Sequence, residues 1–260
     1  MFLFTKNMEE DYRFMKQGVE NGTITQERLE DAVTRILATK AALKLPEKKE
    51  NGTLIPNLAE AKKIVGCAEH KAIEIECSDK AVTLIKNKDG ILPLDAKKYK
   101  RVLLYPIVMT GENFFGGDSG TETAEIKAAL EKEGFVVTVF ETSGGFEGTV
   151  KPSAEIKDNY DLIIYAANLS TKSNQTTVRI EWAQPMGANV PNYINVVPTI
   201  FISFANPYHL LDVPRIRTFI NAYKFKPANV EAVMDKLMGR SEFKGISPVD
   251  AFCGKWDTKL

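Results

Sequence analysis

The feature that most constrains the fold is a series of short, continuous apolar runs in the second half of the chain. They cover residues 101–108, 135–140, 161–167 and 199–205, with a weaker run at 217–223. Continuous runs of this length are typical of strands in a parallel sheet that is buried on both faces. Amphipathic helical patterns occupy residues 122–133 and 229–238. We therefore predict an α/β fold, a three-layer α/β/α sandwich around a mostly parallel sheet.

The first 45 residues predict two helices. A helix over 25–43 is indicated by apolar residues at the three-and-four spacing of one helix face, with Thr25 as its N-cap. A second helix covers 9–19, and Asn21-Gly22 separates the two. A helical hairpin has no core of its own, so its apolar stripe must pack on another surface. We expect that surface to be the sandwich or a second copy of the chain, which would form a homodimer through Leu29, Val33, Ile36 and Leu37.

Between these parts, residues 46–57 lose the helical periodicity and contain prolines, a glycine and several charges, as exposed linkers do. The predicted organisation is a helical segment over 1–45, a linker over 46–57 and the sandwich domain over 58–260. Helical patterning resumes over 59–78, and a short apolar run follows at 81–85.

Charge and cysteine content narrow the class of protein. The chain has 34 basic and 34 acidic residues, which argues against a nucleic-acid or anionic-membrane partner. No apolar run approaches the roughly 18–20 residues that span a bilayer. Three cysteines without paired spacing and two histidines predict neither a disulfide framework nor a metal site, so we expect a cytoplasmic protein without metal or cofactor.

Two polar segments are candidate sites. The loop over 111–122 follows a predicted strand and contains Asp118, but it matches neither nucleotide-binding glycine motif, and Ser119 with Glu122 has the spacing of a capping box. An anion site and a plain helix cap both remain open there. The second segment contains Arg179, Glu181 and Trp182. These three suit a sugar contact, and they equally suit an interdomain contact or plain packing at the edge of the fold.

Catalytic residues are harder to find. Glu181 is a candidate, but the common glycosidase mechanism needs two carboxyl groups roughly 5–10 Å apart, and no partner is evident in the sequence. His70 and His209 have no Ser or Cys nucleophile beside them in a recognisable arrangement, which favours structural roles for both.

A resemblance extends this interpretation. The string ITQERLEDAVTRILATKAAL at 24–43, then His70, then AIEIECSDKAVTLIKNKDGILPL at 72–94, resembles the junction of glycoside hydrolase family 3 between its catalytic barrel and its C-terminal sandwich domain. The β-N-acetylhexosaminidase branch is the most similar. The resemblance implies that residues 1–45 end a (β/α)8 barrel and that the remainder is the sandwich.

The resemblance also implies what this chain would lack. The nucleophilic aspartate of the family belongs to a barrel strand upstream of the matched region, as do the substrate motif and the acid/base histidine of the hexosaminidase branch. We therefore expect the C-terminal, accessory domain of a β-N-acetylhexosaminidase or β-glucosidase, inactive by itself, which meets its carbohydrate through a barrel supplied elsewhere. The alternative is a non-catalytic, flavodoxin-like module that binds a small ligand or a sugar through the loop over 111–122.

Overall fold

The computed structural model describes residues 3–108, 121–141, 151–171, 178–183 and 187–255. The chain divides into two compact units, Met1–Cys67 and Ala68–Leu260. No helix in these described ranges is long and apolar enough to span a membrane. The candidate residue Asp118 and its neighbour Ser119 lie outside the described residues.

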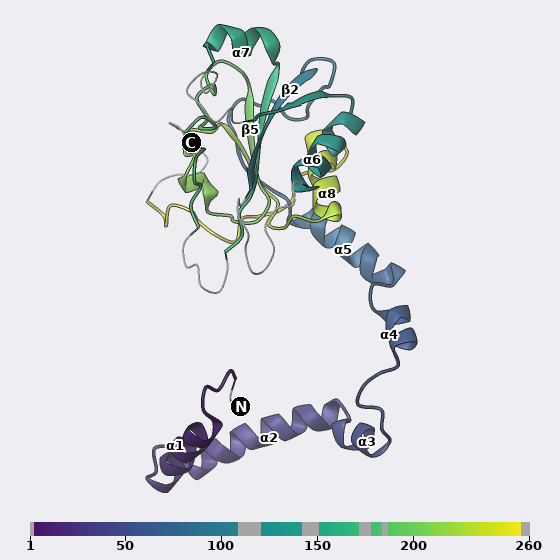
Figure 1. Ribbon diagram of the computed structural model, residues 1–260, viewed down its shortest axis with the longest axis vertical. Coiled ribbons are helices and arrows are strands. Elements are labelled where there is room, and N and C mark those ends of the chain that lie inside the picture. The colour runs from purple at the N-terminus through teal and green to yellow at the C-terminus, as the bar shows by residue number, and fades with distance from the viewer. Residues whose placement is uncertain (1–2, 109–120, 142–150, 172–177, 184–186, 256–260) are drawn as a thin grey trace. The chain divides into compact units, whose positions relative to one another are not determined.

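The first unit consists of four helices (Figure 1). The two predicted helices are confirmed as α1 (Met8–Glu20) and α2 (Gln26–Ala42). The Thr25 side chain accepts a hydrogen bond from the backbone N–H of Arg28 at 3.2 Å, which makes it the predicted N-cap. Gly22 has a φ of +79°, a conformation that glycine adopts without strain between the two helices.

Part of the segment predicted as linker is helical. Helix α3 covers Leu45–Glu50, and α4 covers Leu58–Ile64. Pro46 lies in the first turn of α3, where its missing N–H leaves no helical hydrogen bond unmade. The prediction treated this proline as a helix breaker, whereas its position at the helix start makes it compatible with one.

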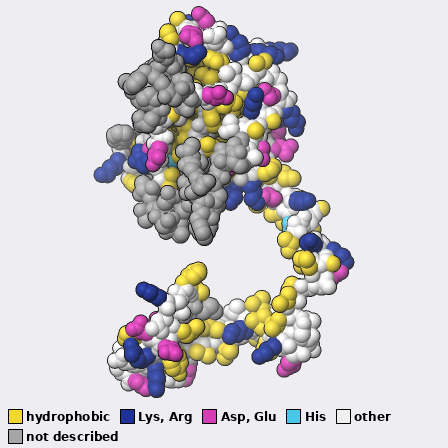
Figure 2. Space-filling view, viewed as in Figure 1, with side chains coloured by type: hydrophobic (Ala, Val, Ile, Leu, Met, Phe, Trp, Pro, Cys, Tyr) yellow, Lys and Arg dark blue, Asp and Glu magenta, His cyan; other side chains and the backbone are white. Residues whose placement is uncertain are grey.

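The apolar stripe of α2 is only partly covered within its unit. Leu29 and Ile36 are half-buried, whereas the exposed fractions of Val33 and Leu37 are 43% and 57%. Neither α1 nor α2, both fully described, contains a buried residue. Figure 2 shows hydrophobic side chains on the surface of these helices. Homodimer formation through the stripe stays a prediction.

The second unit is built on a six-stranded sheet. Its strands are β1 (Thr83–Asn87), β2 (Arg101–Val108), β3 (Val136–Val139), β4 (Leu162–Asn168), β5 (Thr199–Ser203) and β6 (Thr218–Asn221). Their order is β1-β6-β5-β4-β2-β3, and β1 alone among them is antiparallel to its neighbour. The predicted mostly parallel α/β sandwich is confirmed. After β2 the chain adds β3 on one side of that strand and then β4, β5 and β6 in turn on the other side. The strand order therefore reverses between β2 and β4, and ligands of open α/β sheets often bind at such a point.

Both faces of the sheet are covered. On one face pack α6 (Thr121–Lys132) and α8 (Pro227–Leu237), which lie beside the sheet in Figure 1. Helix α5 (Ala68–Ala81) contacts α8 and buries only Ser78. On the other face lie α7 (Ser153–Asn159), the 3-10 helix η1 (His209–Leu211) and irregular segments that contribute Ile180, Tyr193 and Val213 to the core. The predicted helix over 59–78 is divided at Gly66, which has a φ of +71°.

An aromatic ladder runs across the second face. It consists of Phe140, Tyr105, Tyr165, Phe201 and Phe219, stacked in that order with ring centroids 4.5, 4.6, 5.9 and 5.1 Å apart. The last four occupy matched register positions on β2, β4, β5 and β6. In-register parallel pairing therefore aligns one ring per strand into a continuous stack.

A buried cation joins α5 and α8 to the chain that follows α8. Lys236 of α8 has a side chain only 1% exposed, and its Nζ donates to Asp79 Oδ1 of α5 at 3.0 Å. It also donates to Ser241 Oγ at 3.1 Å and to the Glu242 carbonyl at 2.8 Å. Three acceptors thus replace the water that this ammonium group gives up on folding.

Candidate functional site

The segment over 178–183 crosses the second face of the sheet and carries the predicted residues Arg179, Glu181 and Trp182. Its start is tied to the chain after β5, because Asn206 Nδ2 donates to the Val178 carbonyl at 3.2 Å. Ile180 is buried in the core of this face. Arg179 and Glu181, on either side of Ile180, are exposed.

Arg179 forms a charged network with two residues of the η1 turn. Its Nε donates to Asp212 Oδ1, and His209 Nδ1 lies 3.0 Å from Asp212 Oδ2. The exposed fraction of the side chain is 57% for Arg179 but only 6% for Asp212 and 0% for His209. Burial acts to raise the pKa of Asp212, but hydrogen bonds from His209 and Arg179 prevail and hold that pKa below its usual value. Asp212 is therefore an ionised carboxylate below the surface.

His209 is a buried histidine in this network. Its Nε2 is buried and has no hydrogen-bond partner among the described residues. The structural role of His209 stays a prediction. His70 lies exposed on α5.

Trp182 lines a pocket of about 240 Å³, hereafter the Trp182 pocket. Its polar lining consists of Asn192, Asn195, Asp212 and Arg215, and its apolar lining includes Val190 and Ile194. An aromatic ring, two amides, a carboxylate and a guanidinium supply the apolar face and the hydrogen-bonding groups that a sugar ring requires. Of the predicted residues, the structure brings Trp182 into this pocket and places Arg179 behind it, on Asp212.

Hydrogen bonds between Ala183 and residues 188–189 fix the chain next to Trp182. The Asn189 side chain accepts from the Ala183 N–H at 2.7 Å, and the Ala188 N–H donates to the Ala183 carbonyl at 3.2 Å. Gly187 has a φ of +65°, and a Cβ there would lie 2.8 Å from Val190 Cγ2. A larger side chain at position 187 would be strained by this φ and would displace Val190 from the pocket wall.

Glu181, the candidate catalytic carboxylate, lies apart from the network of Arg179, Asp212 and His209. Its side chain is exposed, it does not line the Trp182 pocket, and it makes no hydrogen bond or ion pair within the described part of the chain. Nothing there tests Glu181 as a catalytic residue. Glu122, at the start of α6, accepts a hydrogen bond from Asn168 Nδ2 at 2.8 Å, at the carboxyl end of β4. The described ranges contain no group of three or more His, Cys, Asp or Glu side chains that could hold a metal ion.

Sequence reasoning missed Asp212, Asn192, Asn195 and Arg215. They lie 10 to 33 positions from Trp182 and share no motif with it. The one available signal was the polar residue density of the segments around them, which is equally typical of ordinary loops.

Comparison with known proteins decides the family. A "Beta-N-acetylglucosaminidase/beta-glucosidase" from Cellulomonas fimi is 48% identical over all 260 residues, which cover 45% of its length. A solved structure named "Beta-glucoside phosphorylase BglX" is 42% identical, with a TM-score of 0.76 over 98% of this chain and 44% of its own. The chain belongs to glycoside hydrolase family 3 and corresponds to the C-terminal part of its members.

Family 3 also accounts for the fold. A glycoside hydrolase family 3 β-N-acetylglucosaminidase from Paenibacillus, 19% identical, matches 90% of this chain and 41% of its own with a TM-score of 0.51. At that identity the likeness concerns the fold alone. The chain spans less than half the length of the family 3 relatives described above. No protein-family model matches it.

Proposed function

We propose that this chain supplies the C-terminal, accessory half of a family 3 enzyme that cleaves β-glucosides and N-acetyl-β-glucosaminides. The observation that carries the proposal is the 48% identity to the Cellulomonas fimi enzyme, which extends without interruption over all 260 residues. The 42% identity to a β-glucoside phosphorylase supports the same class of sugar substrate.

The chemistry supports a division of labour between two halves. Retaining cleavage of a glycosidic bond needs a nucleophile that forms the glycosyl-enzyme and a second group that protonates the leaving oxygen. Glu181 is the one carboxylate that the sequence puts forward, and a single carboxylate cannot perform both tasks. The nucleophile implied by the family resemblance belongs to the barrel half of the relatives.

The first test is a glycosidase assay on separate and combined halves. We expect no turnover of 4-nitrophenyl N-acetyl-β-glucosaminide or 4-nitrophenyl β-glucoside by this chain alone. Turnover is expected when it is co-expressed with the part of the Cellulomonas fimi relative that it does not match. Each assay is run with and without inorganic phosphate, because a phosphorylase transfers the glycosyl group to phosphate and a hydrolase transfers it to water. Activity of the repurified chain alone would contradict the proposal.

Glu181→Gln provides the control within the same assay. A general acid or base contributes roughly 10²–10⁴-fold to the rate, so a smaller loss of about threefold or less is expected if Glu181 has no such role. A loss of about a hundredfold or more in the combined halves would establish Glu181 as a catalytic carboxylate.

We also propose that the Trp182 pocket contacts carbohydrate. The chain has two tryptophans, so in a Trp256→Phe background the fluorescence comes from Trp182 alone. N-acetylglucosamine is expected to shift this emission saturably, and Asn195→Ala to weaken binding about fivefold through the loss of one hydrogen bond. Asn87→Ala, an exposed asparagine outside the pocket, is the matched control. If about 100 mM sugar leaves the Trp182 emission unchanged, the sugar binds with less than about 1.4 kcal/mol of free energy. That result would favour an interdomain role for Trp182 instead.

A cytoplasmic location is part of the proposal. Cys67, Cys77 and Cys253 are all free thiols in the structure, and free thiols are usual in a reducing compartment.

A further inference from the structure

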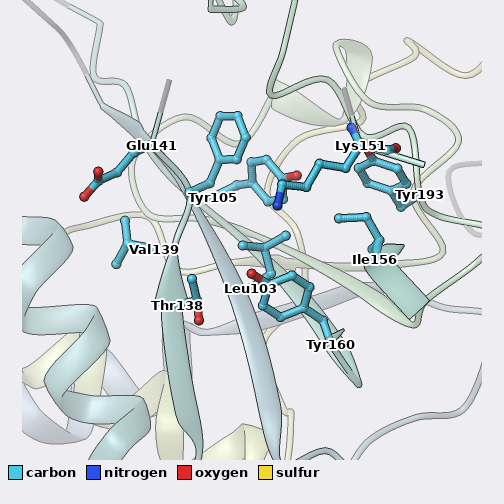
Figure 3. Close-up of a pocket in the computed structure, with 10 residues that line it drawn as sticks. Leu103, Tyr105, Thr138, Val139, Glu141, Lys151, Ile156, Tyr160 and Tyr193 are labelled. Atoms are coloured by element: carbon cyan, nitrogen blue, oxygen red, sulfur yellow. The ribbon is translucent and has the colours of Figure 1, made fainter. Parts of the chain in front are cut away.

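A second pocket, here called the tyrosine pocket, opens at the β2–β3 end of the aromatic ladder. It has a volume of about 190 Å³, and Figure 3 shows its lining side chains from β2, β3, α7 and the segments beside them. Its lining is Leu103, Tyr105, Thr138, Val139, Phe140, Glu141, Lys151, Ile156, Tyr160 and Tyr193. It shares no residue with the Trp182 pocket, so the two are independent sites.

The Tyr105 hydroxyl is the unusual group in this pocket. Tyr105 is 2% exposed as a residue, and its hydroxyl makes no hydrogen bond among the described residues. The hydroxyl is not one of the buried atoms left without a partner there, so it borders the open pocket. Such a hydroxyl is open to a molecule that enters the pocket, because no described protein group takes up its capacity to donate and accept hydrogen bonds. Burial raises the pKa of Tyr105 far above its ordinary value, so the phenol stays protonated and can donate.

Neighbouring tyrosines show how the same group is satisfied elsewhere. The Tyr165 hydroxyl, on the next ring of the ladder, donates to the Val190 carbonyl at 3.3 Å. The Tyr193 hydroxyl donates to the Lys151 carbonyl and accepts from the Lys151 N–H, both at 2.9 Å. Among these three buried rings, only Tyr105 keeps a hydroxyl available to a molecule that enters the pocket.

The other residues that line the tyrosine pocket indicate which kind of ligand it can bind. Leu103, Val139 and Ile156 are apolar, and Phe140 and Tyr160 present aromatic surface. Polar groups at the same pocket are the Thr138 and Tyr160 hydroxyls and the Glu141 carboxylate. The Lys151 ammonium group is already paired with Glu155 at 2.6 Å. A planar ring with one polar substituent would pack against these apolar and aromatic walls and pair its substituent with the Tyr105 hydroxyl. An apolar cavity of about 150 Å³ is known to hold benzene, so the volume suits one ring.

We propose that the tyrosine pocket binds a small phenol, with the ring against the apolar and aromatic walls and the hydroxyl paired with that of Tyr105. The proposal rests on this geometry alone and does not depend on the catalytic function proposed above. Phenolic leaving groups of aryl β-glucosides belong to the same chemical class, so a product of such a reaction would be a ligand.

The test is a comparison of two ligands and three proteins, by isothermal titration calorimetry on the full 260-residue chain. Phenol is expected to bind the unaltered chain about tenfold more tightly than toluene, which has a ring of similar size without the hydroxyl. Tyr105→Phe is expected to weaken phenol binding by about the same factor and to leave toluene binding unchanged. Tyr165→Phe, the adjacent ring outside the pocket, is the matched control and should leave both affinities unchanged.

Thermal unfolding separates binding from folding. Tyr105→Phe removes a hydroxyl without a partner, so we expect an unchanged melting temperature, whereas Tyr165→Phe loses a hydrogen bond and should melt lower. The absence of saturable phenol binding, or an equal loss of phenol and toluene binding in Tyr105→Phe, would overturn the proposal. Tighter binding of glucose than of phenol would do the same. None of these results would bear on the activity of the combined enzyme halves.

Discussion

Replacing Phe201 by alanine is expected to lower the free energy of unfolding of the second unit by about 3–5 kcal/mol. Phe201 is fully buried on the central strand β5. It lies between Tyr165 and Phe219 in the aromatic ladder, with centroids 5.9 and 5.1 Å away. Alanine would remove the ring, and the neighbouring rings are fixed by strand register and cannot move together to fill the space.

Urea denaturation followed by circular dichroism measures this loss. Phe201→Leu keeps part of the volume and is expected to lose less than Phe201→Ala, since the cavity it leaves is smaller. Tyr208→Ala is the control, because that ring is 47% exposed and its removal is expected to change the unfolding free energy by about 0.5 kcal/mol or less. A Phe201→Ala loss as small as that of Tyr208→Ala would mean that the ladder contributes little to stability.

The second large effect is expected from Asp79→Ala, which removes the carboxylate from the buried Lys236. Breaking a buried ion pair by removing one partner typically costs about 3–5 kcal/mol. Because the Asp79 side chain is 40% exposed and partly screened by water, we expect a loss nearer to 2–3 kcal/mol. The Lys236 ammonium group would retain only the Ser241 hydroxyl and the Glu242 carbonyl as partners.

A comparison of variants isolates the contribution of the buried charge. Lys236→Met keeps much of the apolar stem and removes the charge, and Asp79 can then be hydrated through its exposed side. We therefore expect Lys236→Met to be less destabilising than Asp79→Ala, and the double variant to resemble Lys236→Met. Greater instability of Lys236→Met than of Asp79→Ala would contradict this account.

The same pair makes stability depend on pH. The Ser241 hydroxyl lowers the pKa of Asp79, burial opposes this, and the hydrogen bond from Lys236 lowers it further, with a net decrease. A carboxyl group whose pKa is lower in the folded state stabilises the fold above its unfolded pKa of about 3.9 and loses that contribution as the pH falls through the folded value. The difference in stability between the unaltered chain and Asp79→Ala should therefore be constant at neutral pH and decrease below about pH 4.

Local patterns were sufficient for most elements of the fold. The continuous apolar runs placed β2, β4, β5 and β6, because a strand buried on both faces cannot alternate polar with apolar residues. The run at 135–140 also placed β3, although in this edge strand only Val137 is buried. Helix spacing and caps placed α1, α2, α6 and α8. Helix α7, within a polar stretch, was missed because it covers only seven residues and buries Ile156 alone. A helix that short has almost no periodicity to detect.

The sequence by itself determined the α/β class, the helical N-terminal segment and, through two matched strings, the family. Only the tertiary structure decided the strand order, the antiparallel edge strand β1 and the two pockets. It placed Asp212 between Arg179 and His209, and it left the Tyr105 hydroxyl unpaired. The physical reason is that periodicity and capping depend on residues within a few positions of one another. A pocket depends on which distant segments the sheet register brings together, and no short pattern in the chain encodes that register.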